Sequence, residues 1–380
     1  MDKKETKKTI WVFALASFLN DFGSDMIYSV WPLFLTVFLG ANVAVLGLID
    51  GLGDAVVSIS QAVSGYLSDK IKKRKVFIWT GYILGVLSRI GYALSISWNY
   101  IIPFRILDRS GKIRNAPRDA IVADISAKKE RGKNFGILRT FDNLGAIAGI
   151  LTSILLFGTL GYRKLFLIAA VPSLIGAVIL FVYVKERRTI IKISKGISFK
   201  DLNHNFKLFL LASSFFALGS FSYSFLLVYA QKFGFKAAFI PVLYLIFTLV
   251  AFLFSYYFGK LSDKIGRKSV VFISFIFWLL TCLTLVFAQS YLFVIIAFIL
   301  YGLYKAAFET VQRAFVAELA PVKFRASTLG GFQMIVGLIA LPASVFAGVL
   351  WINFNKFVPF YFSIALTVIS MIILMFVKEK

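Results

Sequence analysis

Long apolar runs separated by short polar loops recur along the whole chain. Each run approaches or exceeds the roughly 20 apolar residues that a helix needs to cross a bilayer. Because a helix satisfies its backbone hydrogen bonds within one such segment, each run is predicted to be a transmembrane helix. The predicted spans are 10–38, 44–68, 76–96, 99–124, 135–158, 164–184, 207–231, 237–260, 269–288, 291–318, 326–349 and 356–377. The pattern therefore predicts an all-α membrane protein with twelve transmembrane helices.

The composition agrees with this pattern and excludes several classes of protein. Of the 380 residues, 59% are hydrophobic and 16% are charged, whereas soluble domains carry roughly 25% charged residues. Spans and short loops occupy almost the whole length, which leaves no room for a sizeable soluble domain. Cys282 and His204 are the only residues of their types, so a disulfide framework, a Cys- or His-ligated metal and histidine catalysis are not expected. We predict no enzyme activity, no cofactor and no metal.

Basic residues gather in alternate loops, and this sets the predicted orientation. The net charge is +24, but the bases lie between apolar runs, which favours membrane orientation over nucleic-acid binding. One side receives Lys3, Lys4, Lys7, Lys8, Lys70, Lys72, Lys73, Arg74, Lys75, Lys128, Lys129, Arg131, Lys133, Lys260, Lys264, Arg267 and Lys268. The other side receives only Arg163, Lys164, Lys232, Lys236 and Lys356. The positive-inside rule then predicts a multi-pass protein of the cell membrane with both termini cytoplasmic.

The two halves of the chain are related in sequence. Residues 65–71 (GYLSDKI) match residues 259–265 (GKLSDKI) at an offset of 194 (259 − 65). The same offset places residues 120–124 (AIVAD) on residues 314–318 (AFVAE) without a gap. Parallel repeats of six spans are typical of several secondary transporters.

We therefore predict two pseudo-symmetric six-helix bundles. They comprise residues 1–185 and 207–380, and a basic cytoplasmic linker at 186–206 joins them.

The loop sequences resemble those of a known family. Residues 259–268 (GKLSDKIGRK) are similar to the loop signature of the major facilitator superfamily, and residues 65–74 carry a second copy with Lys72 in place of a glycine. Residues 105–112 (RILDRSGK) and 116–120 (APRDA) occupy the place of its arginine motif. The chain resembles more narrowly a prokaryotic subgroup whose substrates are mostly unassigned. The resemblance implies a carrier whose bundles rock around a central cavity.

Ionisable residues inside the spans are the candidate functional residues. A charge at the bilayer centre costs at least about 2.5–3.5 kcal/mol, so it normally faces protein or water. The candidates for the substrate and proton pathway are Asp21, Asp25, Asp50, Asp54, Arg89, Arg105, Asp108, Arg109, Lys112, Asp142, Lys305 and Glu309. The residues at the offset of 194 from Asp21, Asp50, Asp54 and Arg105 are the uncharged Phe215, Tyr244, Thr248 and Ile299. Polar chemistry is thus concentrated in the first half.

A carboxyl group in an apolar cavity favours its neutral form and can bind and release a proton. The preferred hypothesis is proton-coupled antiport that exports an amphipathic or cationic molecule, with Asp21, Asp25, Asp50 and Asp54 as the proton-coupling groups. One alternative is uptake of an anionic metabolite bound by Arg89, Arg105, Arg109 and Lys112. Further alternatives are export of a divalent metal through the carboxylates and a membrane sensor without transport.

Some residues within the spans also have a structural interpretation, as ion pairs or as packing contacts between helices. Asp108 with Lys112, and Lys305 with Glu309, are spaced to form ion pairs within one helix. Gly145 and Gly149 form a small-xxx-small pair, which is typical of close helix packing.

The resemblance also implies a cytoplasmic gate. Asp69 is expected near Arg325 at the start of the eleventh helix, and Asp263 near Arg131 at the start of the fifth. The residues of this gate are Asp69, Lys70, Arg74, Arg131, Asp263, Arg267, Lys268 and Arg325. The expected partners are a small-molecule substrate, protons and the lipid bilayer, with no nucleic acid, and the expected assembly is a monomer.

Overall fold

The computed structural model describes residues 3–71, 73–127, 130–184, 186, 202–320 and 325–379, without the side chains of residues 3, 4, 69, 131, 132 and 325–327. The first helices are α1 (Lys3–Tyr28), α2 (Trp31–Leu33), η1 (Phe34–Phe38), α3 (Val43–Ile71), α4 (Lys75–Leu94), α5 (Trp98–Ser110), η2 (Gly111–Arg114), α6 (Asn115–Ile125) and α7 (Arg131–Tyr183). They are followed by α8 (His204–Gly219), α9 (Tyr223–Phe233), η4 (Ala237–Phe239), α10 (Ile240–Ile265), α11 (Arg267–Val286), α12 (Tyr291–Leu319), α13 (Arg325–Asn353) and α14 (Val358–Met375). The predicted all-α class is confirmed.

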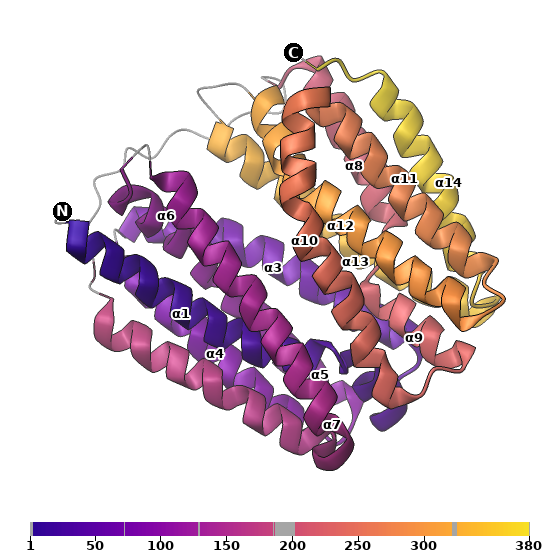
Figure 1. Cartoon of the computed structure of the whole chain (residues 1–380), viewed down its shortest axis with the longest axis horizontal. Helices are drawn as coiled ribbons and strands as arrows, with labels where there is room; N and C mark the ends of the chain where they lie inside the picture. Colours follow the sequence, from indigo (N-terminus) through magenta and orange to yellow (C-terminus); the bar gives the residue numbers. More distant parts are fainter. Residues whose placement is uncertain are drawn as a thin grey trace. The chain divides into compact units, whose positions relative to one another are not determined.

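The helices account for the twelve predicted spans. Nine stretches of the described residues are long and apolar enough to cross a membrane. The longest of them, Lys133–Tyr183, holds two spans, because α7 turns back at Gly161, where φ is 63° (Figure 1). The first span (α1, α2 and η1) and the fourth span (α5, η2 and α6) complete the set of twelve. Both of these spans are interrupted and carry charged residues, which lowers their hydropathy.

The chain forms two compact units. Unit 1 comprises Met1–Gly40 and Val56–Ile193, and unit 2 comprises Ala41–Ala55 and Ser194–Lys380, each over its described residues. The first half of α3 therefore belongs to unit 2. There Gly47 and Gly51 lie against the backbone of Ser344 and Leu341 in α13.

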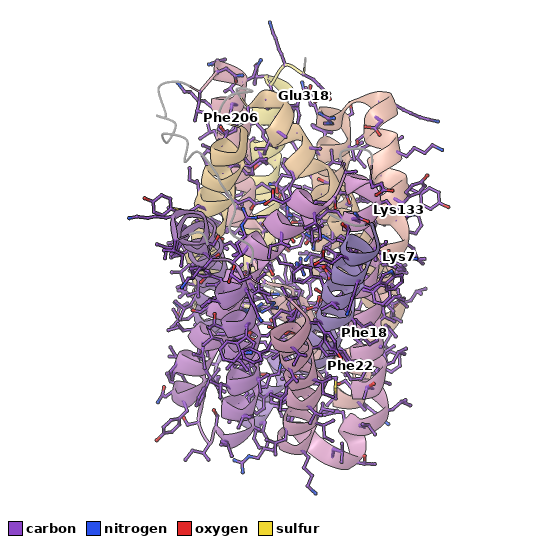
Figure 2. The ribbon with its side chains drawn as sticks, turned by 90° about the vertical axis from the view of Figure 1, so that its left-hand side faces the viewer. Lys7, Phe18, Phe22, Lys133, Phe206 and Glu318 are labelled. Atoms are coloured by element: carbon purple, nitrogen blue, oxygen red, sulfur yellow. The ribbon has the colours of Figure 1, made fainter. Side chains whose placement is uncertain are left out.

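Unit 1 is built around α1, which packs along α7, while α7 also packs along α4. Gly145 and Gly149 of α7 lie against the backbone carbonyl oxygens of Phe18 and Phe22, at positions where a Cβ atom would stand 2.3 and 2.1 Å away. Figure 2 shows these two phenylalanines along α1, with Lys7 and Lys133 towards the same end of the unit. The predicted packing role of the two glycines is confirmed.

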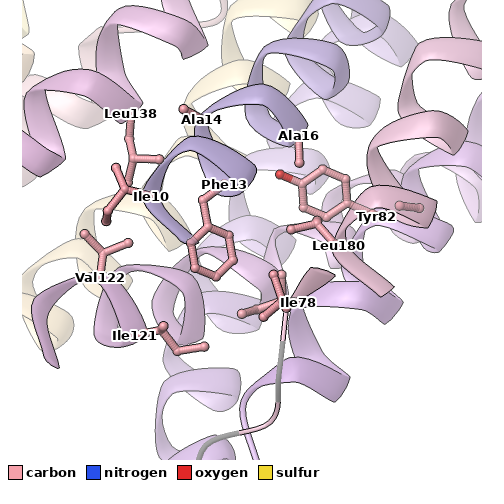
Figure 3. Close-up of a cluster of buried hydrophobic side chains, with 12 residues drawn as sticks. Ile10, Phe13, Ala14, Ala16, Ile78, Tyr82, Ile121, Val122, Leu138 and Leu180 are labelled. Atoms are coloured by element: carbon pink, nitrogen blue, oxygen red, sulfur yellow. The ribbon is translucent and has the colours of Figure 1, made fainter. Parts of the chain in front are cut away.

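An apolar core joins four helices of unit 1 at the end of α1 that carries Lys7. Its buried side chains come from α1, α4, α6 and α7, with one residue just after α7 (Figure 3). They are Ile10, Phe13, Ala14, Ala16, Ile78, Tyr82, Ile121, Val122, Leu138, Ala177, Leu180 and Val184. This core holds the N-terminal part of α1, so the polar residues further along α1 have fixed neighbours.

Unit 2 is held together mainly by aromatic side chains. The helix α12 packs against α10 and α11, and α8 packs against α13 and α14. The rings of Phe216 and Phe275 stack with their centroids 4.0 Å apart. The indole N–H of Trp278 donates a hydrogen bond to Ser363 Oγ at 2.8 Å, which satisfies this buried group. Unit 2 therefore has a closely packed aromatic interior.

Candidate functional site

The first transmembrane span is broken near its middle. The helix α1 ends at Tyr28, and the next helical residues are Trp31–Leu33, which contain Pro32. A single π-helical turn, η1, then completes the span. Discontinuous helices at membrane depth commonly form binding sites, because their side chains and freed backbone groups face polar partners.

A buried polar cluster lies beside this break. We call it the break cluster, and its members are Tyr28, Ser88, Arg105, Asp108 and Arg109. The Tyr28 hydroxyl donates a hydrogen bond of 2.7 Å to Asp108 Oδ2. Ser88 Oγ donates to Asp108 Oδ1 at 3.4 Å, and Arg109 Nε lies 3.8 Å from Asp108 Oδ2. Three elements, α1, α4 and α5, thus converge on one carboxylate.

The two arginines of the break cluster are held on aromatic rings. The Arg105 guanidinium lies 4.5 Å from the ring centroid of Trp31 and 5.7 Å from that of Tyr28. The Arg109 guanidinium lies 4.8 Å from the same Tyr28 ring. Cation–π contacts of this kind stabilise a desolvated guanidinium and fix its plane. Arg105 is 1% exposed, so a planar fork that suits carboxylate or phosphate groups is held in the interior of unit 1.

Arg89 has a different environment from the other predicted bases. Its Nη2 donates to the backbone oxygen of Asn20 at 3.0 Å and to Ser24 Oγ at 2.8 Å, and its Nη1 donates to the oxygen of Ala169 at 3.2 Å. Among the described residues, its hydrogen-bond acceptors are all neutral groups. Arg89 therefore fastens α1 to α4 and α7.

Asn20 connects Arg89 to a predicted carboxylate. Its side-chain oxygen accepts from Arg89 Nη2 at 3.3 Å, and its Nδ2 donates to Asp21 Oδ1 at 2.8 Å. Asp21 is half-buried. The amide thus satisfies a cation on one side and an anion on the other.

A second polar cluster lies further along unit 1. We call it the Asp142 cluster, and its members are Ser17, Arg118, Asp119, Arg139 and Asp142. Arg118 Nη1 donates to Ser17 Oγ at 2.7 Å, and Arg118 Nε bonds Asp119 Oδ1 at 3.0 Å. Asp142 lies 3.9 Å from Arg118 Nη1 and 3.5 Å from Arg139 Nη1. The elements α1, α6 and α7 meet here.

The remaining predicted pathway residues are distributed over both units. In unit 1, Asp25 and Lys112 are half-buried. In unit 2, Asp50 is 2% exposed and accepts a hydrogen bond of 2.7 Å from Ser222 Oγ, while Asp54 is exposed.

An ion pair occupies the middle of α12. Lys305 Nζ lies 2.7 Å from Glu309 Oε1, with exposed side-chain fractions of 31% and 64%. This confirms the pairing predicted from the spacing. A charged pair at mid-span is too costly to face lipid, so its exposed side suits an aqueous surface.

Several partners of the predicted residues were missed by sequence reasoning. They include Ser17, Asn20, Ser24 and Tyr28, which recur every three or four residues on α1 and therefore share one face. That polar stripe in an otherwise apolar helix was the available signal. Arg118 was visible in the fourth-span motif, but its role as a contact of Asp142 was not.

The loop ends of each unit carry one repeated arrangement. In unit 1, Arg74 Nη1 lies 2.5 Å from Asp124 Oδ2, and Glu186 Oε1 accepts the backbone N–H of Arg74 at 2.8 Å. In unit 2, the Arg267 side chain bonds Glu318. The backbone N–H groups of Arg267 and Lys268 there bond the Glu379 carboxylate. A carboxylate at a helix N-terminus accepts hydrogen bonds from otherwise unpaired N–H groups and interacts favourably with the positive end of the helix dipole. Arg74, Arg267 and Lys268 of the predicted gate thus have partners within their own units.

The structure gives no ion pair for the other predicted gate residues whose side chains it describes. Lys70 Nζ lies 5.9 Å from the ring centroid of Tyr66, and Asp263 is exposed. The side chains of Asp69, Arg131 and Arg325 lie outside the described part of the chain, as does most of the predicted linker. The two gate pairs therefore stay predictions.

Apolar spans, interrupted helices and buried ionisable groups are together typical of a multi-pass membrane transporter. A model of the Major Facilitator Superfamily matches residues 13–206 and 208–380, so this chain belongs to that superfamily. It is a secondary transporter of a small molecule, not a member of an enzyme family. The resemblance found in the loop signature is confirmed.

Known proteins similar to this chain agree with the family. An uncharacterized MFS-type transporter of Methanocaldococcus jannaschii is 38% identical over 98% of this chain and 96% of its own. Multidrug resistance protein 2 of Bacillus subtilis is 27% identical over 70% of each chain.

Solved structures agree on the fold. A point mutant of the nucleoside transporter NupG superposes with a TM-score of 0.81, at 15% identity over 97% of this chain and 99% of its own. A bacterial homologue of the human lysosomal transporter Spinster, inward-facing and occupied, has a TM-score of 0.78, at 16% identity over 99% and 97%.

Proposed function

We propose that this transporter carries a small organic anion in a proton-coupled cycle and that the break cluster of unit 1 binds the anion. The observation that carries the proposal is the pair Arg105 and Arg109, one turn apart on α5 and both stacked on Tyr28. Stacked guanidinium groups present fixed donors in the geometry that carboxylate and phosphate groups accept.

Asp108 supplies the exchange that transport requires. It lies between the two arginines in sequence and close to Arg109 in space, at 3.8 Å. A substrate anion that enters the cluster competes with this carboxylate for the guanidinium donors. When a carboxylate of unit 1 is protonated, it loses its charge and binds the neighbouring arginines more weakly. Those arginines can then bind the substrate anion, so proton binding and anion binding favour each other.

A second candidate is export of an amphipathic or cationic molecule, with the acids as the coupling groups. Unit 2 favours it, because a continuous aromatic group includes Phe216, Phe247, Trp278, Tyr301 and Tyr304. The ring centroids of Phe247 and Tyr301 lie 5.0 Å apart, and those of Trp278 and Tyr304 lie 5.2 Å apart. Aromatic faces bind cations and apolar bodies alike. The similarity to a multidrug resistance protein also supports this candidate.

The proposed orientation follows the basic loops. Lys7 and Lys133 lie towards one end of unit 1, as the positive-inside rule requires if that end is cytoplasmic (Figure 2). We propose that both termini are cytoplasmic, that the two sequence repeats act as the moving bundles, and that the monomer is the transporting unit.

Transport by the purified full-length protein in proteoliposomes tests the proposal. The anionic probes are radiolabelled succinate, glutamate and glycerol phosphate, and the cationic probes are tetraphenylphosphonium and ethidium, each with an imposed pH gradient. We expect gradient-driven accumulation of at least one anion. Transport of cations without any anion, or no flux of either class, contradicts the proposal.

Variants of Arg105 make the test specific. Loss of a charged hydrogen bond costs about 1.5–3 kcal/mol, so Arg105→Gln is expected to raise the half-saturating anion concentration roughly 10- to 100-fold. Arg105→Lys keeps the charge but loses the planar fork, and it should fall between Arg105→Gln and the unaltered protein. The matched control is Arg163→Gln, which removes an exposed arginine that also lies on a ring, 5.6 Å from the centroid of Phe38.

A further inference from the structure

The Asp142 cluster contains a carboxyl oxygen with unusual surroundings. Asp142 Oδ1 is buried, and within the described part of the chain no donor meets it with regular hydrogen-bond geometry, although the Ser17 hydroxyl lies near enough to interact with the Asp142 carboxyl group. Arg118 Nη1, its nearest recorded cation, is 3.9 Å away and donates instead to Ser17 at 2.7 Å. A buried carboxylate oxygen without a donor disfavours the charged form, whereas a protonated carboxyl group needs fewer donors.

The other oxygen of Asp142 is only weakly held. Arg139 Nη1 lies 3.5 Å from Oδ2, but the Arg139 side chain is 58% exposed, so solvent screens this pair. Arg118 is committed more closely to Asp119, at 3.0 Å. Both arginines that face Asp142 thus lie at 3.5 Å or more, whereas Asp119 has Arg118 at 3.0 Å.

Charged groups face Asp142 from each packed helix. Arg118 and Asp119 approach from α6, Arg139 lies on α7 itself, and Asp21 acts on Asp142 electrostatically from α1. Asp21 also interacts electrostatically with Lys112 of η2 and Tyr82 of α4. Two neighbouring carboxylates in a desolvated site favour the uptake of one proton between them.

We propose that Asp142, with Asp21 as the neighbouring carboxylate, is the binding site for the coupling proton, separate from the break cluster. The proposal rests on the proposed function, since it names the group that carries the proton in that cycle. A hydronium ion donates its proton to Asp142 and leaves as water, and the reverse transfer releases the proton on the other side of the membrane.

A polar stripe on α1 connects the proton site to the break cluster. Asp21 accepts from Asn20, Asn20 accepts from Arg89, and Arg89 also donates to Ser24. Tyr28, one turn beyond Ser24, donates to Asp108. From Ser17 to Tyr28 the stripe covers about 16 Å at 1.5 Å per residue, roughly half the hydrocarbon thickness. The two clusters thus lie at different depths and are linked along one helix face.

Infrared spectroscopy of the full-length protein in lipid nanodiscs tests the proton site without any substrate. Acidification from alkaline pH produces the carbonyl band of each carboxyl group that becomes protonated. We expect a buried-carboxyl band that Asp142→Asn removes and that the matched control Asp263→Asn, at an exposed carboxyl group, retains. Loss of the band in Asp142→Asn, alone or together with Asp21→Asn, supports the proposal. Loss in Asp21→Asn alone, or in neither variant, overturns it.

A conservative variant covers the case in which Asp142→Asn does not fold. Asp142→Glu keeps the carboxyl group but moves it by one methylene, so its band should persist at a shifted frequency. An unchanged band in Asp142→Glu assigns the signal to another residue and overturns the proposal.

Transport separates this proposal from the proposed function. With an anion that the unaltered protein accumulates, Asp142→Asn should lose proton-driven accumulation but keep counterflow of the labelled anion. Accumulation that survives in Asp142→Asn overturns the proton site and leaves the anion site standing. If the unaltered protein moves no anion, the proposed function fails, while the infrared result still decides whether Asp142 binds the proton.

Discussion

The close contact between α1 and α7 at Gly149 predicts how much stability the protein loses when this glycine is replaced by alanine. A Cβ atom built on Gly149 would stand 2.1 Å from the carbonyl oxygen of Phe22, 2.9 Å from its carbonyl carbon and 3.1 Å from its Cα atom. All three are backbone atoms, so no side chain can rotate away. Gly149→Ala therefore requires the two helices to separate by about 1 Å, against the close packing of the protein interior.

The expected cost is that of overpacking a well-packed contact. Such substitutions destabilise by about 1–3 kcal/mol. At about 2–4 °C per kcal/mol for a unit of this size, Gly149→Ala should lower the melting temperature by roughly 2–12 °C.

Gly158 provides the matched control on the same helix. Apart from the neighbouring backbone of its own helix, no atom of the described residues lies within 4 Å of a Cβ atom built there. Gly158→Ala should therefore be neutral or stabilising by about 0.5–1 kcal/mol, because alanine has the higher helix propensity. The assay is thermal unfolding of both purified variants in one detergent. Equal melting temperatures, or a larger fall for Gly158→Ala, would refute the packing argument.

Three further predictions concern contacts within single units, and thermal unfolding in detergent measures each of them. Arg89→Ala should destabilise by about 2–5 kcal/mol, since it removes charged hydrogen bonds to Asn20, Ser24 and Ala169 and leaves buried acceptors unsatisfied; a loss below about 1 kcal/mol would contradict its role in fastening α1. Glu379→Ala removes the carboxylate at the start of α11 and should cost about 0.5–2 kcal/mol, whereas Glu379→Asp should recover part of it. Trp278→Phe loses the bond to Ser363 and should cost about 1–3 kcal/mol, and no change would show that water replaces the indole N–H.

The predicted spans agreed with the structure because their signal is local. A run of about 20 apolar residues has one stable form in lipid, whatever surrounds it. The pairing of Lys305 with Glu309 was also predictable, since residues four apart on a continuous helix are neighbours.

The other predicted ion pair, between Asp108 and Lys112, is absent from the ion pairs of the described residues. The spacing from Asp108 to Lys112 suits an α-helix, but α5 ends at Ser110 and the tighter η2 turn follows. With about three residues per turn, η2 departs from the 3.6-residue spacing on which the predicted pair depends, and Asp108 acts on Lys112 only through its charge. Asp108 is bound instead by Tyr28, 80 residues earlier in the chain, and by Ser88, 20 residues earlier.

The sequence alone determined the twelve helices, the repeat of the two halves, the family and the presence of ionisable groups at membrane depth, because all of these depend on composition and short-range order. Only the tertiary structure decided which groups meet. It placed Arg105 on Trp31 and Arg118 beside Asp142, and it surrounded Arg89 with neutral oxygens. Such contacts join helices far apart in the chain and depend on how closely glycines let those helices approach, so no local pattern contains them.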